Sequence, residues 1–331
     1  MKRTKKNTHI WQLLATLLLL VTAFVLSACS SDDTNATPND VNESEIRFNP
    51  SVWQVLEGTR ATFYDTGASL ASGSFICYAF NANSTTPYIN QTTVNYTAGQ
   101  WTFEDGKHYW PADGSLDFFA YMPVGGGGYV NSIAYTTARN PQFNCVSLPM
   151  TYNSASSNEG QGSDLQEFVF ALVTDRTKAL DGANGVTLNF QHPFACIKFL
   201  LSASHPNIII NSITFKGIKN NGSYSHNSSP KWTTTGDATN FVMTLTEEAA
   251  TFNNNTTTKQ IGTDYLMIPQ EWTGEIEVNA SWNDWGDTPV AHTVTTTIQT
   301  ITWQPGYSYT YTFTISPDDL IVDTTNFTEQ W

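Results

Sequence analysis

The chain has 331 residues and a formal net charge of −14 at pH 7, although only 13% of its residues are charged. Ordinary soluble domains carry about 25% charged residues, so uncharged polar side chains must supply most of this surface. The acidity disfavours nucleic acid and anionic lipid head groups as partners, because like charges repel. The length allows two domains of about 150 residues each after a processed N-terminus.

The first 29 residues have the pattern of a lipoprotein signal peptide. Basic residues between positions 2 and 6 precede an apolar run from Leu13 to Leu26, and Ser27 and Ala28 then lead into Cys29. This pattern predicts cleavage after residue 28 and acylation of Cys29, which anchors the mature protein to a membrane without crossing it. The alternative is an uncleaved signal anchor, but the apolar run is shorter than the roughly 20 residues that a spanning helix needs.

Residues 29–44 are rich in Asp, Asn, Thr and Pro, and they predict a flexible acidic tether. From Ile46 onward the sequence predicts strand after strand. Tyr307 to Ser316 alternates aromatic or apolar residues with Ser and Thr, which indicates one buried and one solvated face. Shorter alternating segments begin at Val186, Phe241 and Ile276. Phe75–Phe80 and Phe168–Val173 are nearly continuous apolar runs, as in central strands covered on both faces.

These short strands predict an all-β fold made of β-sandwiches. The turn-forming stretch at residues 178–185, KALDGANG, lies near the middle of the mature chain. We therefore expect an N-terminal domain over residues 45–183 and a C-terminal domain over residues 184–331. Gly125–Gly128 and Asn220–Pro230 are expected to form loops.

The sequence contains no recognisable catalytic constellation. The Gly125–Gly128 run lacks the Lys-Ser/Thr that a phosphate-binding loop needs, and no Cys/His spacing predicts a metal site. His108 lies beside Glu104 and Asp105, but Gly106 and Lys107 complete a turn-forming stretch there. We expect a solvated turn in that stretch, a core or edge histidine at His192, no cofactor and no enzyme activity. Cys77, Cys145 and Cys196 are expected to be buried thiols, although one disulfide among them remains an open alternative.

The tryptophans offer one candidate ligand site. Trp282 is expected to face inward from its strand, whereas Trp285 lies in a turn beside Asp284. An exposed Trp next to Asn and Asp could stack on a sugar ring and bond its hydroxyls, so Trp285 and Asp284 are candidate glycan contacts. The alternative is that Trp285 closes one end of the core. The other tryptophans are expected to fill cores; they are Trp53, Trp101, Trp110, Trp232, Trp272 and Trp303.

An ordered set of landmarks runs along nearly the whole mature chain. They are Glu45–Phe48, Trp53, Gly58–Ala61, Tyr78–Phe80, Trp101, Lys107–Pro111, Leu116–Pro123, Val186–Pro193, Ala195–Phe199, Leu266–Gln270 and Pro305–Tyr307. Together with the lipoprotein signal, this order resembles the fimbrillin family, in particular its Mfa-like branch, which builds type V pili. The resemblance implies two tandem transthyretin-like β-sandwich domains and export to the cell surface as an outer-membrane lipoprotein.

The resemblance also implies a way of assembling. In polymerising members an arginine-specific protease removes the first strand, and a strand of a neighbouring subunit fills the groove. Arg60 and Arg47 are the candidate cleavage sites here, and Arg60 is favoured because it follows the expected first strand. The alternative is that both are ordinary surface arginines of an uncut protein. Leu320, Ile321 and Val322 form a candidate donor strand, or alternatively a last strand packed on its own domain.

Two functional hypotheses follow from these observations. The first is a structural or adhesive pilus subunit whose partners are other pilin subunits and the outer membrane, with a host glycan or protein as receptor. The second is a monomeric surface lipoprotein that binds glycans and keeps its N-terminus uncut. The resemblance along the whole chain favours the first hypothesis.

Overall fold

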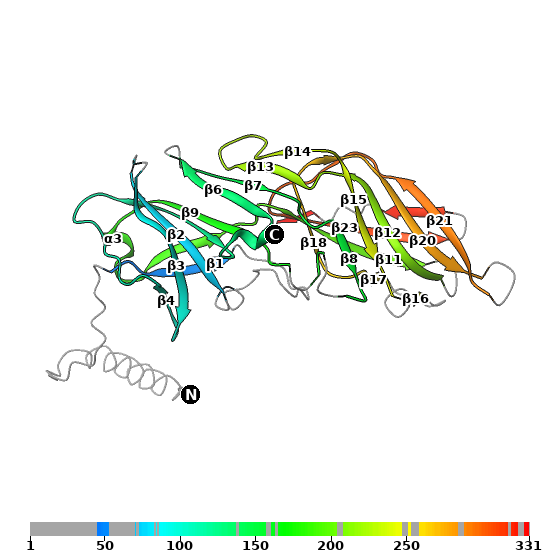
Figure 1. Cartoon of the computed structure of the whole chain (residues 1–331), viewed down its shortest axis with the longest axis horizontal. Helices are drawn as coiled ribbons and strands as arrows, with labels where there is room; N and C mark the ends of the chain where they lie inside the picture. Colours follow the sequence, from blue (N-terminus) through cyan, green and yellow to red (C-terminus); the bar gives the residue numbers. More distant parts are fainter. Residues whose placement is uncertain are drawn as a thin grey trace, which may run out of the picture. The chain divides into compact units, whose positions relative to one another are not determined.

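The computed structural model describes residues 45–52, 70, 73–82, 84, 86–136, 139–156, 160–162, 165–203, 208–246, 251–252, 258–283, 288–316, 319–323 and 328–330 (Figure 1). Within these residues almost every element is a strand. The exceptions are a 3₁₀ turn, η1 (Gly126–Gly128), and a single helical turn, α3 (Lys178–Asp181). The all-β prediction is therefore confirmed, whereas the transthyretin-like detail stays a prediction.

A five-stranded antiparallel sheet forms the middle layer of the N-terminal half. Its order is β4 (Gln100–Phe103), β3 (Pro87–Thr97), β2 (Ser74–Asn81), β5 (Leu116–Met122) and β9 (Val169–Arg176). Every residue of β5 is buried, because other strands cover both faces of this sheet. The nearly continuous apolar runs that begin at Phe75 and Phe168 therefore belong to strands covered on both faces, as predicted.

A two-stranded parallel sheet covers the first face of the middle layer. It pairs β1 (Phe48–Val52) with β10 (Val186–Phe190), and Phe48 lies opposite Val186 in the register. Val186, Leu188 and Phe190 alternate with exposed residues and point into a core that they share with Phe48. We call this two-layer unit the N-terminal sandwich.

A four-stranded sheet covers the second face of the middle layer. Its order is β14 (Trp232–Thr235), β13 (Asn221–Ser225), β7 (Asn140–Cys145) and β6 (Val130–Thr136). The loop expected over Asn220–Pro230 was therefore wrong in its first half. The polar sequence of β13 hid the strand, because only Tyr224 supplies a large buried side chain there. Gly222 allows β13 to lie close to β14, since a Cβ there would lie only 3.0 Å from the Thr233 carbonyl oxygen.

His226, just after β13, makes this layer sensitive to acid. Its Nδ1 lies 3.2 Å from the Tyr224 hydroxyl, and its ring packs edge-on against Phe170. Burial, aided by the charge of Lys231, lowers the His226 pKa. Below the ordinary histidine pKa of about 6.5 the unfolded chain therefore binds more protons than the folded one, and stability falls as the pH falls.

We predict a matching difference in urea unfolding. Between about pH 7.5 and about pH 5.5 the His226→Gln variant should lose less stability than the parent chain, because its side chain does not titrate. Unfolding midpoints at several pH values measure this. Identical pH slopes for the two proteins would contradict it.

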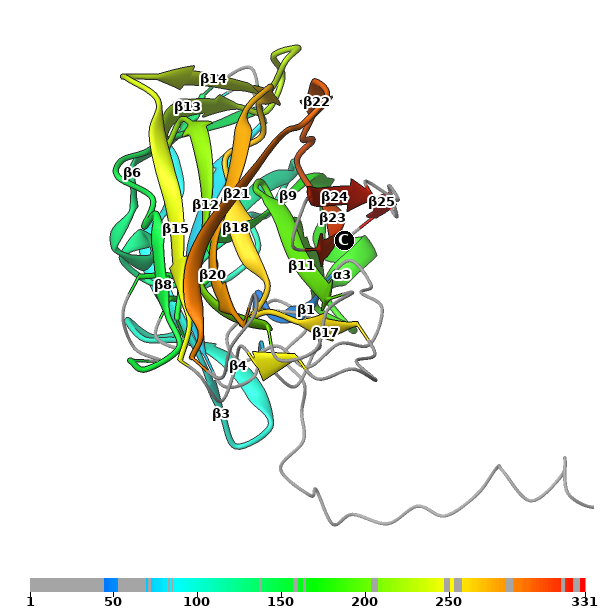
Figure 2. The ribbon, with the colours of Figure 1, turned by 90° about the vertical axis from the view of Figure 1, so that its right-hand side faces the viewer.

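The C-terminal half is a second sandwich. Figure 2 shows one layer of long strands facing another. The first sheet has the order β21 (Val290–Thr297), β20 (Glu275–Trp282), β12 (Ile208–Ile218), β15 (Thr239–Thr244) and β8 (Thr151–Asn153), with β16 (Thr251–Phe252) also on β12. The second has the order β17 (Lys259–Gln260), β11 (Ala195–Ala203), β23 (Tyr307–Ser316) and β24 (Asp319–Asp323), with β18 (Tyr265–Met267) on β11 and β25 (Thr328–Gln330) on β23. A short pair, β19 (Glu271–Trp272) with β22 (Ile301–Thr302), lies beside them.

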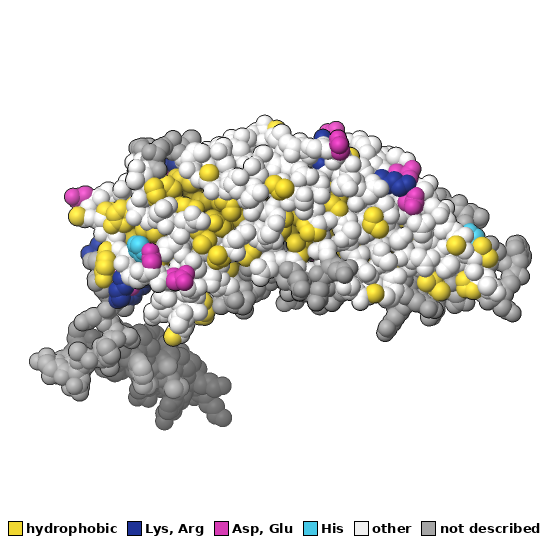
Figure 3. All heavy atoms as spheres, in the orientation of Figure 1, with side chains coloured by type: hydrophobic (Ala, Val, Ile, Leu, Met, Phe, Trp, Pro, Cys, Tyr) yellow, Lys and Arg dark blue, Asp and Glu magenta, His cyan; other side chains and the backbone are white. Residues whose placement is uncertain are grey.

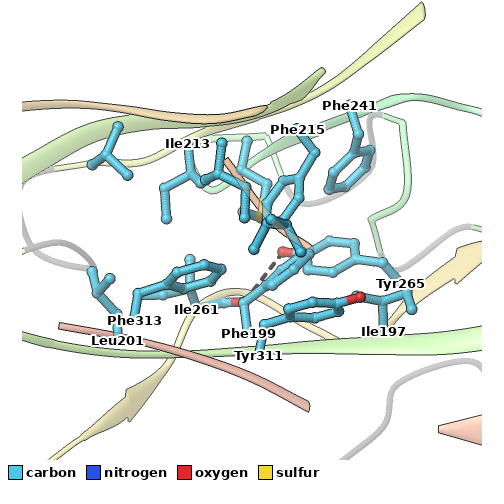
Figure 4. Close-up of a cluster of buried hydrophobic side chains, with 14 of the residues drawn as sticks. Ile197, Phe199, Leu201, Ile213, Phe215, Phe241, Ile261, Tyr265, Tyr311 and Phe313 are labelled. Carbon is cyan, nitrogen blue, oxygen red and sulfur yellow. Dashed lines mark hydrogen bonds between the residues drawn. The ribbon is translucent and has the colours of Figure 1, made fainter. Parts of the chain in front are cut away.

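Aromatic side chains from both sheets fill the core of this second sandwich. In Figure 4, Phe215 and Phe241 of one sheet face Phe199 and Tyr311 of the other. The rings of Phe199 and Phe215 stack with centroids 4.3 Å apart. The predicted alternation of β23 is confirmed from Tyr309 onward, because Tyr309, Tyr311, Phe313 and Ile315 are buried while the threonines between them are half-exposed. At the start of the strand it is not, since Tyr307 is only half-buried and Ser308 is buried.

Gly274 closes one side of this core. A Cβ there would lie 2.3 Å from Trp272 Nε1 and 2.4 Å from the Lys216 carbonyl oxygen. These two atoms form a hydrogen bond of 2.9 Å that holds the indole over Trp303. We predict that Gly274→Ala lowers the free energy of unfolding by about 1–3 kcal/mol, as overpacking does.

Thermal or urea unfolding measures this loss. Thr273→Ala, at the exposed neighbouring position, is the control and should change stability by less than about 0.5 kcal/mol. A Gly274→Ala variant as stable as the parent would contradict the packing described for Trp272.

Several links join residues on the two sides of position 183. The parallel pair β1–β10 and the antiparallel sheet of β6, β7, β13 and β14 each take strands from both sides. In addition, β8 pairs with β15. Residues 43–331 accordingly form one unit of contacts, and the expected domain boundary at residue 183 stays a prediction.

Candidate assembly site

The first strand is held by hydrogen bonds to β10, and the residues just before it also bond to the segment at residues 108–109. Among the described residues β1 pairs only with β10. The Val186 amide donates to the Arg47 carbonyl oxygen at 2.7 Å, and the Ile46 amide donates to the His108 carbonyl oxygen at 2.8 Å. Pro50 lies within the strand and has no amide hydrogen, which is a common feature of edge strands. β1 is therefore a short peripheral strand at the start of the described fold.

Buried apolar side chains anchor this short strand and the residues just before it to the N-terminal core. Phe48 is only 7% exposed and Ile46 only 2%. The Phe48 ring makes edge-to-face contacts with Phe75, Phe103 and Phe118 at centroid distances of 5.3–5.7 Å. Removing β1 would open an aromatic-lined slot between the β10 edge and the middle sheet.

The candidate donor strand lies at the other end of the chain. Leu320, Ile321 and Val322 belong to β24, which pairs antiparallel with the second half of β23. β25 pairs with the first half of the same strand. These two short strands therefore lie along the edge of β23 opposite β11. In this structure the segment is the last part of its own sheet, which is one of the two alternatives left open by the sequence.

Several predicted site residues lie outside the described residues, namely Cys29, Arg60, Asp284 and Trp285. Arg47 is described and lies directly before β1, with its Nη2 3.4 Å from a Glu45 carboxylate oxygen and 31% of its side chain exposed. Trp110, Trp232, Trp272, Trp282 and Trp303 are buried, as predicted. Trp101 departs from that prediction because it is only half-buried, on the edge strand β4.

The described cysteines are poorly suited to chemistry. Cys77, Cys145 and Cys196 are buried and form no disulfide with one another. Burial raises the pKa of the Cys145 thiol to about 12 and that of Cys77 well above its usual range. Since the thiolate is the nucleophile, neither thiol is activated at neutral pH.

The histidines singled out by the sequence form ordinary structural contacts. His108 Nε2 lies 2.9 Å from an Asp105 carboxylate oxygen in an exposed turn, as predicted. His192 is buried with its Nδ1 2.6 Å from Glu167 Oε1. Sequence reasoning missed Glu167, because nothing around it marks a buried acid. No group of three metal-ligating side chains was found within the described segments. No helix in the described part of the chain has the length and apolar character needed to span a bilayer.

The fold is that of an all-β sandwich protein with a short peripheral strand near each end of the described chain. The protein-family model described as fimbrillin-like matches residues 59–331 of this chain. The chain therefore belongs to the fimbrillin-like family, and its role is that of a fimbrial subunit at the cell surface. No curated protein sequence matches it.

Solved structures share this fold at low sequence identity. A fimbrial protein from Bacteroides vulgatus is 15% identical, with a TM-score of 0.59 over 87% of this chain and 99% of that one. A candidate cell adhesion protein from Bacteroides ovatus is 17% identical, with a TM-score of 0.56 over 87% of this chain and 97% of that one. A similar candidate from Bacteroides uniformis is 15% identical, with a TM-score of 0.52 over 87% of this chain and 98% of that one.

Proposed function

We propose that this fimbrial subunit is exported as an outer-membrane lipoprotein acylated at Cys29 and assembles by strand exchange after its first strand is removed. It acts as a structural or adhesive protein and not as an enzyme. The observation that carries the proposal is the aromatic slot under β1, occupied by Phe48 on a strand of five residues. A neighbouring strand with an apolar residue at this position would restore the lost contacts.

The position of β1 separates the two candidate cleavage sites. Cleavage after Arg47 would leave Phe48–Val52 attached to the fold, and the slot would stay closed. Cleavage after Arg60 would release the whole of β1. The Arg47 carbonyl oxygen also accepts the Val186 amide, which ties this peptide bond to β10 and hinders a protease. We therefore propose Arg60 as the cleavage site.

The C-terminal strand β24 is the proposed donor. It pairs with one strand, β23, and covers only its second half, from Thr312 to Ser316. When β24 leaves β23 it loses these backbone hydrogen bonds. Buried contacts in the slot of the next subunit would compensate for that loss. The order of events would be cleavage after Arg60, release of β1, detachment of β24 and insertion into the next subunit.

Purified full chain treated with an arginine-specific protease tests this proposal. The parent chain should give a ladder of oligomers, whereas Arg60→Lys should remain monomeric and Arg47→Lys should behave like the parent. Ile321→Asp and Leu320→Asp, which change opposite faces of β24, should still be cut, and one of the two should block assembly. Oligomers from Arg60→Lys, or from both aspartate variants, would contradict the proposal.

A further inference from the structure

A groove runs beside β1 in the part of the chain that the structure describes. Its volume is about 720 Å³. One wall is residues 45–50, the other is the β3–β4 hairpin with the turn at residues 106–107, and residues 183–184 close one end. The groove therefore depends on β1 being in place.

The charged groups that line the groove are arranged unlike two other ion-pair clusters of the described residues. Lys216 contacts two glutamates, and Arg139 contacts two aspartates. In the groove the ratio of acidic to basic side chains is reversed, because the single carboxylate of Glu45 contacts both Arg47, at 3.4 Å, and Lys107, at 3.1 Å. Among the residues that line the groove, positive charges thus outnumber negative ones by one, in a chain of net charge −14, while Glu104 and Asp105 lie in the turn just before the lining residues Gly106 and Lys107. Figure 3 shows that this face of the molecule has few charged groups, and that cationic side chains at one end lie near histidine and acidic ones.

Aromatic side chains lie on the facing wall. Tyr96 is 42% exposed, and its ring centroid lies 5.2 Å from that of Trp101 at a tilt of 52°. Trp101 is fixed from behind by Phe75, at 5.1 Å. The tight turn between these two strands, with Ala98 at φ 52° and Gly99 at φ 84°, holds the pair in place. The exposed amides of Gln100 and Asn49 complete the lining.

We propose that this groove binds an acidic sugar, that is, a saccharide unit bearing a carboxylate. The carboxylate would lie against Arg47 and Lys107, in the charge-assisted contact that a guanidinium favours. The sugar ring would pack on Tyr96 and Trp101, and its hydroxyls would bond the two amides. A few polar groups around an apolar surface are the usual composition of a small-ligand site.

This inference goes beyond the proposed function and does not rest on it. Glu45, Arg47 and Asn49 all precede Arg60, so release of β1 would remove one wall of the groove. The site therefore belongs to the uncut chain. A failure to bind sugar leaves the cleavage test unaffected, and the reverse also holds.

Isothermal titration of the uncut full chain, purified in a detergent without a sugar head group, tests the proposal. The probes are N-acetylneuraminic acid and glucuronic acid, with glucose and acetate for comparison. At least one acidic sugar should bind about ten-fold more tightly than glucose or acetate, and added salt should weaken it. Equal affinity for glucose or acetate would overturn the proposal, as would binding of an extended peptide with no binding of either acidic sugar.

Variants then assign the binding to this groove. Arg47→Gln, Lys107→Gln and Tyr96→Ala should each weaken the acidic sugar at least about five-fold. Tyr96→Phe should retain binding, because the ring is kept. Lys259→Gln, which removes a positive charge from β17 in the second sandwich, should bind like the parent. Unchanged binding in both Arg47→Gln and Tyr96→Ala, with thermal unfolding like the parent's, would overturn the assignment.

Discussion

Replacing Phe48 by alanine is expected to lower the free energy of unfolding by about 3–5 kcal/mol. The side chain is 7% exposed, and three aromatic rings surround it, with centroids within 5.7 Å. Rigid rings on strands of another sheet cannot move in to fill the space, so much of the cavity should remain. Urea unfolding of the full chain gives the loss directly.

The neighbouring residue supplies a matched control for this substitution. Asn49 is exposed on the same strand, and Asn49→Ala should change stability by less than about 0.5 kcal/mol. A synthetic peptide covering residues 45–52 should restore stability to a chain cut after Arg60, because it refills the slot. A Phe48→Ala protein as stable as Asn49→Ala would show that β1 contributes little to the core.

The second large effect concerns the buried pair of Glu167 and His192. Both side chains are fully buried, and the carboxylate lies 2.6 Å from the ring nitrogen. Glu167 directly precedes Phe168 and β9, whereas His192 lies between β10 and β11, so the pair joins the two halves of the chain. Removing one member of a buried pair costs about 3–5 kcal/mol. We expect Glu167→Leu to show a loss of this size.

A double-mutant cycle separates the pair from its surroundings. With both side chains replaced, as in Glu167→Leu with His192→Leu, the loss should be smaller than the sum of the single losses. The exposed pair of Lys216 and Glu275 is the control, and Glu275→Gln should cost less than about 1 kcal/mol. Strict additivity of Glu167→Leu and His192→Leu would contradict the coupling.

Sequence patterns predicted strands well and their partners poorly. The alternation of Ile276, Val278, Ala280 and Trp282 is reproduced in β20, where each of these residues is buried. Alternation reports only which face of a strand is buried, whereas pairing depends on contacts between distant residues. Nothing in the local sequence therefore predicts the parallel pairing of β1 with β10, or that β13 joins β7 across a separation of about 80 residues.

The candidate site was predictable only in part. The resemblance marked Glu45–Phe48 as the opening of the fold, and the structure buries Phe48 there. The groove was missed because its walls combine residues near positions 47, 100 and 184, each unremarkable alone. Trp101 was expected in a core, since a sequence does not tell whether a strand lies at the edge of its sheet. Tyr96 and Trp101 on either side of a two-residue turn were the one available signal.

Mass spectrometry of the subunit in native fimbriae tests the central claim, that removal of the first strand precedes assembly. The account predicts that the assembled subunit begins at Ala61, directly after Arg60. Fimbriae whose assembled subunits still begin at an acylated Cys29 and retain Phe48–Val52 would contradict it.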